Sequence, residues 1–221
     1  MGEKTIIYYT NNKENPEFEK KIQETILENS LGLPIISISQ KPIDFGQNIC
    51  VGDVGSSYFN QFRQIQIGYK TAKTEYVIDA VADTLYPKDY FAFKPTGNIY
   101  RYENGWILWE RKGGRFFKNK FMVSTQCSRR EFALKELEKY FEGYPEWGKD
   151  IKMEKRDYNG IDFEVFNGRI ACVSFKTRYN ISTKSTVGWG GSVTTLPYWG
   201  SVWDLRKKYV PYIFNDNLLH K

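Results

Sequence analysis

The first half of the chain alternates between short β-branched runs and longer stretches with helical periodicity. Three of the runs are typical of buried strands, namely residues 4–10, 34–39 and 75–80. Asn15 followed by Pro16 predicts the start of a helix, because asparagine caps a helix N-terminus and proline fits the first helical position. A second helix is predicted across residues 56–74, with Ser56 or Ser57 as its cap.

Each predicted helix carries one apolar stripe, which indicates a face packed on a sheet. The β-α-β-α-β order predicts a parallel sheet with helices covering its faces. The expected inward positions are Phe18, Ile22 and Ile26 on the first helix, and Phe59, Phe62, Ile65, Tyr69 and Ala72 on the second.

The second half has a different pattern, with short strands between glycine-rich turns and a single clear helix. That helix opens with the capping-box pattern Ser128 to Glu131 and extends to Phe141. Residues 183–200 are rich in Gly, Ser and Thr and are the best candidate for a mobile loop. The strand candidates are residues 98–102, 105–110, 121–126 and 169–175.

The composition fits one α/β domain over residues 1–221, with a mostly parallel sheet in residues 1–95 and a small mixed-strand part in residues 96–221. With 41% hydrophobic and 17% aromatic residues among 221, the chain can bury a sizeable core. No apolar run approaches the roughly 20 residues that a bilayer span needs, and the first residues lack a secretory apolar segment. We therefore expect a cytoplasmic protein that does not bind membranes; the sequence indicates no oligomeric state.

Cysteine and histidine usage narrows the chemistry further. The three cysteines, Cys50, Cys127 and Cys172, are widely scattered, which favours free thiols over a disulfide framework or a zinc site. The only histidine is His220, near the C-terminus, so catalysis by a histidine pair is excluded. Any catalysis must use carboxylates, lysines, arginines or hydroxyls.

The net charge of +6 is unevenly distributed. Residues 111–130 contain basic side chains and no acidic ones, and residues 165–203 are also free of acids but rich in aromatic side chains. Cations beside rings suit a polyanion such as nucleic acid, because the cations contact phosphates and the rings stack on bases or sugars. A solvated basic surface over an aromatic core explains the same pattern, and both interpretations stay open.

Polar side chains follow the predicted strands at the edge where open α/β sheets bind ligands. Thr10 and Asn11 suit the hydrogen-bonding groups of a nucleoside, and Asp83 suits a metal ion on a diphosphate. A partner acid is expected two residues before Asp83, where the chain has Val81. The residues at 10–12 also fit an ordinary polar turn.

The spacing Gly68-x3-Ala72-x-Thr74-x-Tyr76, followed by a strand and Asp83, is similar to the signature of family 2-like glycosyltransferases with the GT-A fold. Four strings resemble a group of bacterial and phage glycosyltransferases: IIYYTNN (6–12), LPIISISQKPIDFG (33–46), NICVGDVG (48–55) and LYP (85–87). The SxQC-xxR pattern of Ser124, Gln126, Cys127 and Arg130 extends the resemblance, which covers residues 4–144.

This resemblance implies a GT-A-like fold and transfer of a sugar from a nucleotide-diphospho-sugar donor to an acceptor hydroxyl. Asp83 is then the implied metal ligand and a catalytic carboxylate. Arg63 fits a diphosphate or base contact, and equally a helix-surface arginine. The resemblance implies donor binding by Thr10, Asn11 and Asp44. Further donor-binding candidates are Gln40, Lys41, Arg63 and Asp79, and Asp79 also fits a structural residue deeper in the strand.

Two departures from the group concern the metal. The group's acidic string A-E-D-D is A-V-A-D at residues 80–83, and Thr177 stands where the group tends to have a histidine. One carboxylate with donor phosphates and water still suffices for Mg²⁺ or Mn²⁺. Alternatively, cationic side chains neutralise the leaving diphosphate, and the candidates are Lys176, Arg178 and Lys184.

Two functions are therefore open. In a glycosyltransferase, Glu103 or Glu110 is the candidate base for the acceptor hydroxyl, although edge ion pairs explain both residues equally well. The resemblance suggests a hydroxymethylated pyrimidine in phage DNA as acceptor, while protein, wall-polymer and lipid acceptors stay open. The alternative is a catalytically weakened GT-A relative that binds nucleotide or nucleic acid without turnover.

Overall fold

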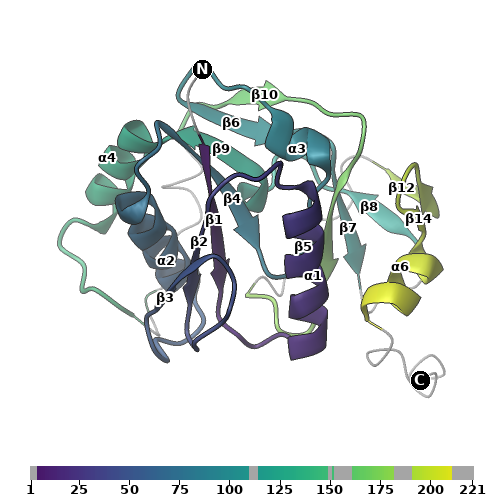
Figure 1. Cartoon of the computed structure of the whole chain (residues 1–221), viewed down its shortest axis with the longest axis horizontal. Helices are drawn as coiled ribbons and strands as arrows, with labels where there is room; N and C mark the ends of the chain where they lie inside the picture. The colour runs from purple at the N-terminus through teal and green to yellow at the C-terminus, as the bar shows by residue number, and fades with distance from the viewer. Residues whose placement is uncertain (1–3, 110–113, 149–150, 152–160, 182–190, 211–221) are drawn as a thin grey trace.

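The computed structural model describes residues 4–109, 114–148, 151, 161–181 and 191–210, and a seven-stranded sheet forms its centre (Figure 1). The strands of this sheet are β1 (Lys4–Thr10), β2 (Ile35–Ser39), β3 (Gln47–Cys50), β4 (Tyr76–Val81), β6 (Ile99–Tyr102), β9 (Gln126–Arg129) and β10 (Glu164–Phe166). Their order is β10-β6-β9-β4-β1-β2-β3. Only β9 runs antiparallel to its neighbours, so the mostly parallel sheet predicted from the sequence is confirmed.

Helices cover both faces of the sheet (Figure 1). The helices α1 (Pro16–Asn29) and α3 (Lys88–Ala92) lie on one face, and α2 (Tyr58–Thr71) and α4 (Arg130–Phe141) lie on the other. Two clusters of buried side chains fill these layers, and the predicted apolar stripes of both N-terminal helices belong to them. The fold is therefore α/β with helices on both sides of the sheet.

The helix starts predicted in the first half are confirmed. The Oδ1 of Asn15 accepts hydrogen bonds from the backbone N–H groups of Glu17 at 2.8 Å and Phe18 at 3.3 Å. At the second helix, the Oγ of Ser57 accepts from the backbone N–H of Asn60 at 3.1 Å. These caps fix where the chain leaves each loop at the ligand-binding edge of the sheet.

The capping box predicted from Ser128 to Glu131 is wrong. Ser128 and Arg129 end strand β9, where Ser128 pairs with both Val77 and Ile99. Because the sheet ladders hold these residues, the helix begins only at Arg130, whose N–H donates to the carbonyl of Glu75.

The strand predicted over residues 121–126 is also mostly wrong. Residues Val123–Thr125 form a short 3-10 helix, η1, and Gln126 begins β9. Phe121 has a φ of 62°, a backbone conformation that no strand residue adopts.

A second sheet packs beside the first and contains β5 (Thr84–Leu85), β7 (Gly105–Trp109), β8 (Phe116–Lys118), β11 (Cys172–Lys176) and β12 (Ser192–Val193). One cluster of buried side chains extends from the central sheet into this one. The hairpin of β13 (Thr195–Leu196) and β14 (Gly200–Ser201) leads into α6 (Val202–Tyr209). Of the predicted mobile loop, residues 191–200 thus contain short strands, and residues 183–190 lie outside the described residues.

Among the described residues, no helix combines the length and apolar character that crossing a membrane requires. The longest helices have 14 residues each and pack against the sheet.

Gly68 lets α2 approach the sheet closely. A Cβ atom at this position would overlap the Cγ2 of Ile7 and lie 3.5 Å from the Cγ1 of Ile38. We expect Gly68→Ala to lower the free energy of unfolding by about 1–3 kcal/mol, because overpacking outweighs the better helix propensity of alanine. Urea denaturation measures this, with Lys70→Ala on the exposed side of the same helix as the control. Unchanged stability of Gly68→Ala would contradict the close contact.

Candidate functional site

A cavity of about 470 Å³ lies where β1, β2 and β4 end. Its walls come from the loop after β1, the start of α2, the turn between β4 and β5, residues 119–124 and the segment around β11. This is the edge of an open α/β sheet at which ligands bind. The predicted site residues that line the cavity are Thr10, Asn11, Gln40, Asp83 and Lys176.

Asn12 holds the ends of β1 and β2 together. Its Oδ1 accepts hydrogen bonds from the backbone N–H groups of Gln40 and Lys41, each at 2.8 Å. Its own N–H donates to the Oγ1 of Thr10 at 2.9 Å, and its φ of 53° is a conformation that asparagine tolerates better than most residues. The side chain of Gln40 in turn donates to the carbonyl of Gly55 at 2.8 Å.

Two amide side chains join this wall to α2. The Nδ2 of Asn11 donates to the Oγ of Ser56 at 2.8 Å. The buried Nε2 of Gln64 donates to the carbonyls of Thr10 at 2.8 Å and Ile38 at 3.1 Å. The polar groups on this side of the cavity are therefore held in place by hydrogen bonds before any ligand binds.

Asp83 stands on the turn between β4 and β5, half-buried in the cavity wall. Its carboxylate accepts hydrogen bonds from the Oγ1 of Thr84, at 3.1 Å, and from the Nδ2 of Asn180. Burial raises the pKa of Asp83 to about 6, against the effect of these two hydrogen bonds. Its carbonyl accepts from the N–H of Phe175 at 2.7 Å, which ties the turn to β11.

Asn180 is a cavity residue that sequence reasoning missed. Its Oδ1 is buried and has no hydrogen-bond partner among the described residues, while its Nδ2 donates to Asp83. A buried acceptor without a donor is rare, and water, a ligand or an ion can satisfy it. No spacing rule connects Asn180 with Asp83, because the contact depends on how β11 packs against β5.

Glu14 also lines the cavity and was not predicted. Its Oε1 accepts a 2.6 Å hydrogen bond from the Oγ1 of Thr177, and the Thr177 hydroxyl also accepts from the N–H of Tyr179 at 3.1 Å. Thr177 stands where the resembling group tends to have a histidine, and it thus donates a hydrogen bond to a carboxylate from the loop after β1. The only signal in the sequence is an acid in that loop, just before the helix cap Asn15.

Three cations line the cavity together with Glu14 and Asp83. The Nζ of Lys176 lies 5.4 Å from the ring centroid of Trp109, and the Nζ of Lys120 pairs with Glu103 at 3.0 Å. The third cation, Arg101, is 4% exposed and donates from Nε to the Oε1 of Gln126 at 3.3 Å. The described lining therefore carries a small excess of positive charge, which suits a phosphate-bearing ligand.

Three predicted donor contacts are not brought to the cavity. Lys41 and Asp44 are exposed and lie outside its lining. The guanidinium of Arg63 lies 3.7 Å from the ring centroid of Phe141 and donates to the carbonyl of Pro145 at 2.8 Å. Arg63 therefore packs α2 against α4 outside the cavity lining, and burial lowers its pKa.

Asp79 is likewise absent from the cavity lining, because it faces α2 inside the protein. It is 1% exposed, and the Tyr69 hydroxyl lies 3.0 and 3.1 Å from its two carboxylate oxygens. Burial raises the pKa of Asp79 to about 8, although the hydrogen bond from Tyr69 opposes the rise. Asp79 is a core carboxyl group.

The remaining candidates are placed as follows. Glu103 is bound by Lys120 and by the Nδ2 of Asn167, at 2.8 Å, and lies outside the cavity lining. Arg178 is exposed, with its guanidinium 5.9 Å from the ring centroid of Tyr179, and also lies outside the lining. Glu110 and Lys184 are outside the described residues.

The basic stretch at 111–130 does not form one surface in the described part of the chain. Of its described basic residues, only Lys120 lines the cavity. Arg129 pairs with Glu75 at 2.9 Å and Arg130 donates to the carbonyl of Thr74, both at the opposite edge of the sheet. The structure therefore favours separate surface roles for these cations over a continuous contact with a polyanion.

Comparison with known proteins identifies solved structures with a similar fold. No protein-family model matches the chain, and no curated protein sequence matches it. Among solved structures, residues 1–349 of TarS from S. aureus, in complex with UDP-GlcNAc, give a TM-score of 0.54 at 9% identity, over 83% of this chain and 61% of that one.

Two further structures have lower scores. The mannosyltransferase PcManGT from Pyrobaculum calidifontis, in complex with GDP-Man and Mn²⁺, has a TM-score of 0.48 at 13% identity, over 81% of this chain and 59% of that one. The inositol-1-phosphate CTP transferase from T. maritima has a TM-score of 0.47 at 13% identity, over 82% and 92%.

The fold is therefore α/β and GT-A-like, as the sequence predicted. The chain covers 59% to 61% of the first three matching structures. At these identities the likeness concerns the arrangement of strands and helices, and the chemistry must be argued from the cavity.

The buried Asp79 makes stability depend on pH. A carboxyl group whose pKa is about 8 in the folded protein and near 4 when unfolded binds more protons in the folded state between these values. The unfolding free energy of the wild type relative to Asp79→Asn should therefore fall from about pH 4 to about pH 8 and then level off. Urea denaturation across this range measures it.

Tyr69→Phe provides the control for this pH dependence. It removes the hydrogen bond that lowers the pKa of Asp79, so the decline should extend to higher pH. If the difference in unfolding free energy between the wild type and Asp79→Asn stays constant with pH, Asp79 is ionised in the folded core.

Proposed function

We propose that this chain is a glycosyltransferase that moves a sugar from a nucleotide-diphospho-sugar donor to an acceptor hydroxyl. The observation that carries the proposal is the cavity at the strand ends, which Asp83, Asn180 and Lys176 line together with Thr10 and Asn11. Hydrogen-bonding groups for a nucleoside and charged groups for a diphosphate thus border one space. The GT-A-like fold agrees with this arrangement, and the TarS structure of that fold was determined with UDP-GlcNAc.

The donor's nucleoside is assigned to the wall built by β1, β2 and α2. Thr10, Asn11 and Gln40 offer hydroxyl and amide groups held by hydrogen bonds, and Glu14 offers a carboxylate that accepts from sugar hydroxyls. Lys176 is assigned to the diphosphate, because its ammonium lines the same space as Asp83 and can neutralise a leaving phosphate.

The oxygen atoms around Asp83 fit a divalent cation. Among the described residues, no three His, Cys, Asp or Glu side chains gather as a metal cluster. Mg²⁺ and Mn²⁺ accept one carboxylate, an amide oxygen, phosphates and water, so Asp83 and the partnerless Oδ1 of Asn180 suffice as protein ligands. A bound cation would supply charge stabilisation for the leaving diphosphate.

The proton of the acceptor hydroxyl needs a carboxylate as its base in an inverting transfer. Glu103 is occupied by Lys120 and Asn167 outside the cavity, so this role stays with Glu110 as a prediction from the sequence. The assignment of a hydroxymethylated pyrimidine as acceptor is supported by the strings at 33–46 and 48–55, which resemble the phage-associated group.

The variant Asp83→Asn tests the proposed roles of Asp83 in sugar transfer from the donor and in metal binding. We expect it to reduce sugar transfer or donor hydrolysis at least about 100-fold and to weaken Mn²⁺ binding in the presence of UDP- or GDP-sugars. Electron paramagnetic resonance of free Mn²⁺ gives the binding, and product analysis gives the rate. Asp79→Asn, which changes a carboxyl group outside the cavity, should leave both unchanged.

The outcomes separate the two functions. Binding of a nucleotide sugar without turnover by the wild type, across a donor and acceptor panel, would favour the binding module. Equal turnover with and without a chelator would contradict the metal assignment alone, because Lys176 then stabilises the diphosphate. Absence of binding to every donor would refute the glycosyltransferase proposal.

The acceptor has its own test. The wild type should label hydroxymethylated DNA with a radioactive sugar and leave unmodified DNA unlabelled. Because of its few cavity-lining cations, binding to DNA should weaken only modestly from about 50 to 200 mM salt. Equal labelling of a glycan or protein acceptor and no labelling of the DNA would contradict this acceptor.

A further inference from the structure

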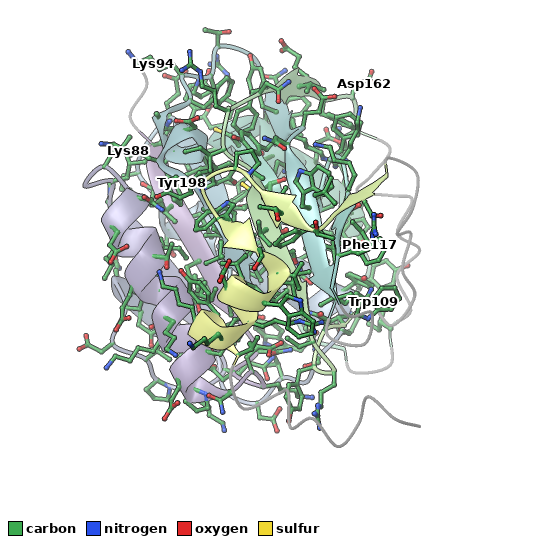
Figure 2. The ribbon with its side chains drawn as sticks, turned by 90° about the vertical axis from the view of Figure 1, so that its right-hand side faces the viewer. Lys88, Lys94, Trp109, Phe117, Asp162 and Tyr198 are labelled. Atoms are coloured by element: carbon green, nitrogen blue, oxygen red, sulfur yellow. The ribbon has the colours of Figure 1, made fainter. Side chains whose placement is uncertain are left out.

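A second cavity, of about 270 Å³, lies at the seam between α1 and α6. In the described part of the chain it shares no lining residue with the cavity at the strand ends. Two contacts hold its walls together: the Nζ of Lys21 donates to the carbonyl of Lys208 at 2.8 Å, and the Thr25 and Tyr209 hydroxyls lie 3.2 Å apart. Figure 2 shows the two helices side by side. The cavity is therefore built between packed elements.

One wall of this cavity is an aromatic side chain held out toward solvent. Tyr198 lies in the loop of the β13–β14 hairpin beside α6 and is 66% exposed (Figure 2). The ring of Trp199 meets it edge-on at a centroid distance of 4.8 Å. The Nε1 of Trp199 donates a 2.7 Å hydrogen bond to the carbonyl of Ala171, so Tyr198 packs against a ring that is held in place.

The backbone at Tyr198 adopts a conformation that is unusual for an aromatic residue. Its φ is +74°, a region that glycine enters freely and that disfavours an aromatic residue. A ring that is mostly exposed gains little from burial to offset this strain. Strained residues that offer side chains to a cavity are typical of ligand sites.

The charges of the lining narrow the ligand class. Glu28 and Asp204 contribute carboxylates and Lys208 the only cation among the described lining residues, so the charge is net negative. The carboxylate of Asp204 accepts from the N–H and hydroxyl of Ser201, which lowers its pKa and keeps it ionised. This lining disfavours phosphates and nucleic acids. Carboxylates accept hydrogen bonds from hydroxyls, and an exposed ring stacks on the apolar face of a pyranose.

We propose that the α1–α6 cavity is a carbohydrate-binding site, in which a neutral pyranose unit stacks on Tyr198 and donates hydroxyl hydrogen bonds to Glu28. The site is separate from the proposed donor site. It does not depend on the transfer reaction, although a glycan acceptor would gain affinity by occupying it.

Calorimetric titration of the whole chain tests the proposal. The probes are the methyl glycosides of glucose, galactose, mannose and N-acetylglucosamine and their short oligomers, each with and without saturating UDP. We expect at least one to bind saturably and equally with UDP present. Tyr198→Gly should weaken this binding at least tenfold while the melting temperature stays the same or rises, because glycine relieves the backbone strain.

Two further variants complete the design. Glu28→Gln should weaken binding several-fold, since it replaces a charged acceptor with a neutral one. Tyr144→Ala removes an exposed tyrosine that lies after α4 and should leave the affinity unchanged.

Several results would contradict the proposed carbohydrate-binding site. They are no binding by any probe up to about 50 mM, equal affinity in Tyr198→Gly, or displacement of the sugar by UDP. Self-association of the wild type that Tyr198→Gly abolishes, seen by sedimentation, would assign this surface to a second copy instead. Loss of transfer activity in other variants would not affect any of these readings.

Discussion

The passage of the chain from β4 into β5 is the constraint on which the site depends. At the end of β4 the chain leaves the central sheet and within three residues joins the second sheet, where β5 pairs with β11. The N–H of Phe175 in β11 donates to the carbonyl of Asp83, so the crossing point is itself hydrogen-bonded to the second sheet. Because the sheets meet there, the cavity has one wall from each, and Asp83 stands at their junction.

The same junction brings further polar side chains to the cavity that Asp83 lines. Asn180 and Thr177 follow β11, so the pairing of β11 with β5 brings them beside Asp83 and Glu14. Asn180 thus donates to Asp83, and Thr177 donates to Glu14, another residue that lines the cavity. These contacts join residues that are distant in the sequence, so only tertiary packing brings the side chains together.

Much of the fold could be predicted from the sequence because its first half relies on local signals. Asn15 and Ser57 cap their helices, and the β-branched runs pack where periodicity places them. The errors occur where strand pairing between distant segments determines the secondary structure. Ser128, for example, was predicted to begin a helix but pairs with Val77 in the sheet. The same division holds for the cavity residues. Thr10 and Gln40 could be predicted because they stand at the ends of predicted strands, whereas Asn180 could not. Arg63 and Asp79 have suitable chemistry, but helix packing directs them into the protein.

The burial around Asp83 determines where a second carboxylate could be placed beside it. Val81 is partly exposed on the cavity wall, so an acid at this position would meet solvent and ligand. Ala82 is 4% exposed and packs in the cluster that joins the two sheets. A carboxylate there would need space and compensation for desolvation. A second acid beside Asp83 would therefore be accommodated more readily at residue 81 than at residue 82.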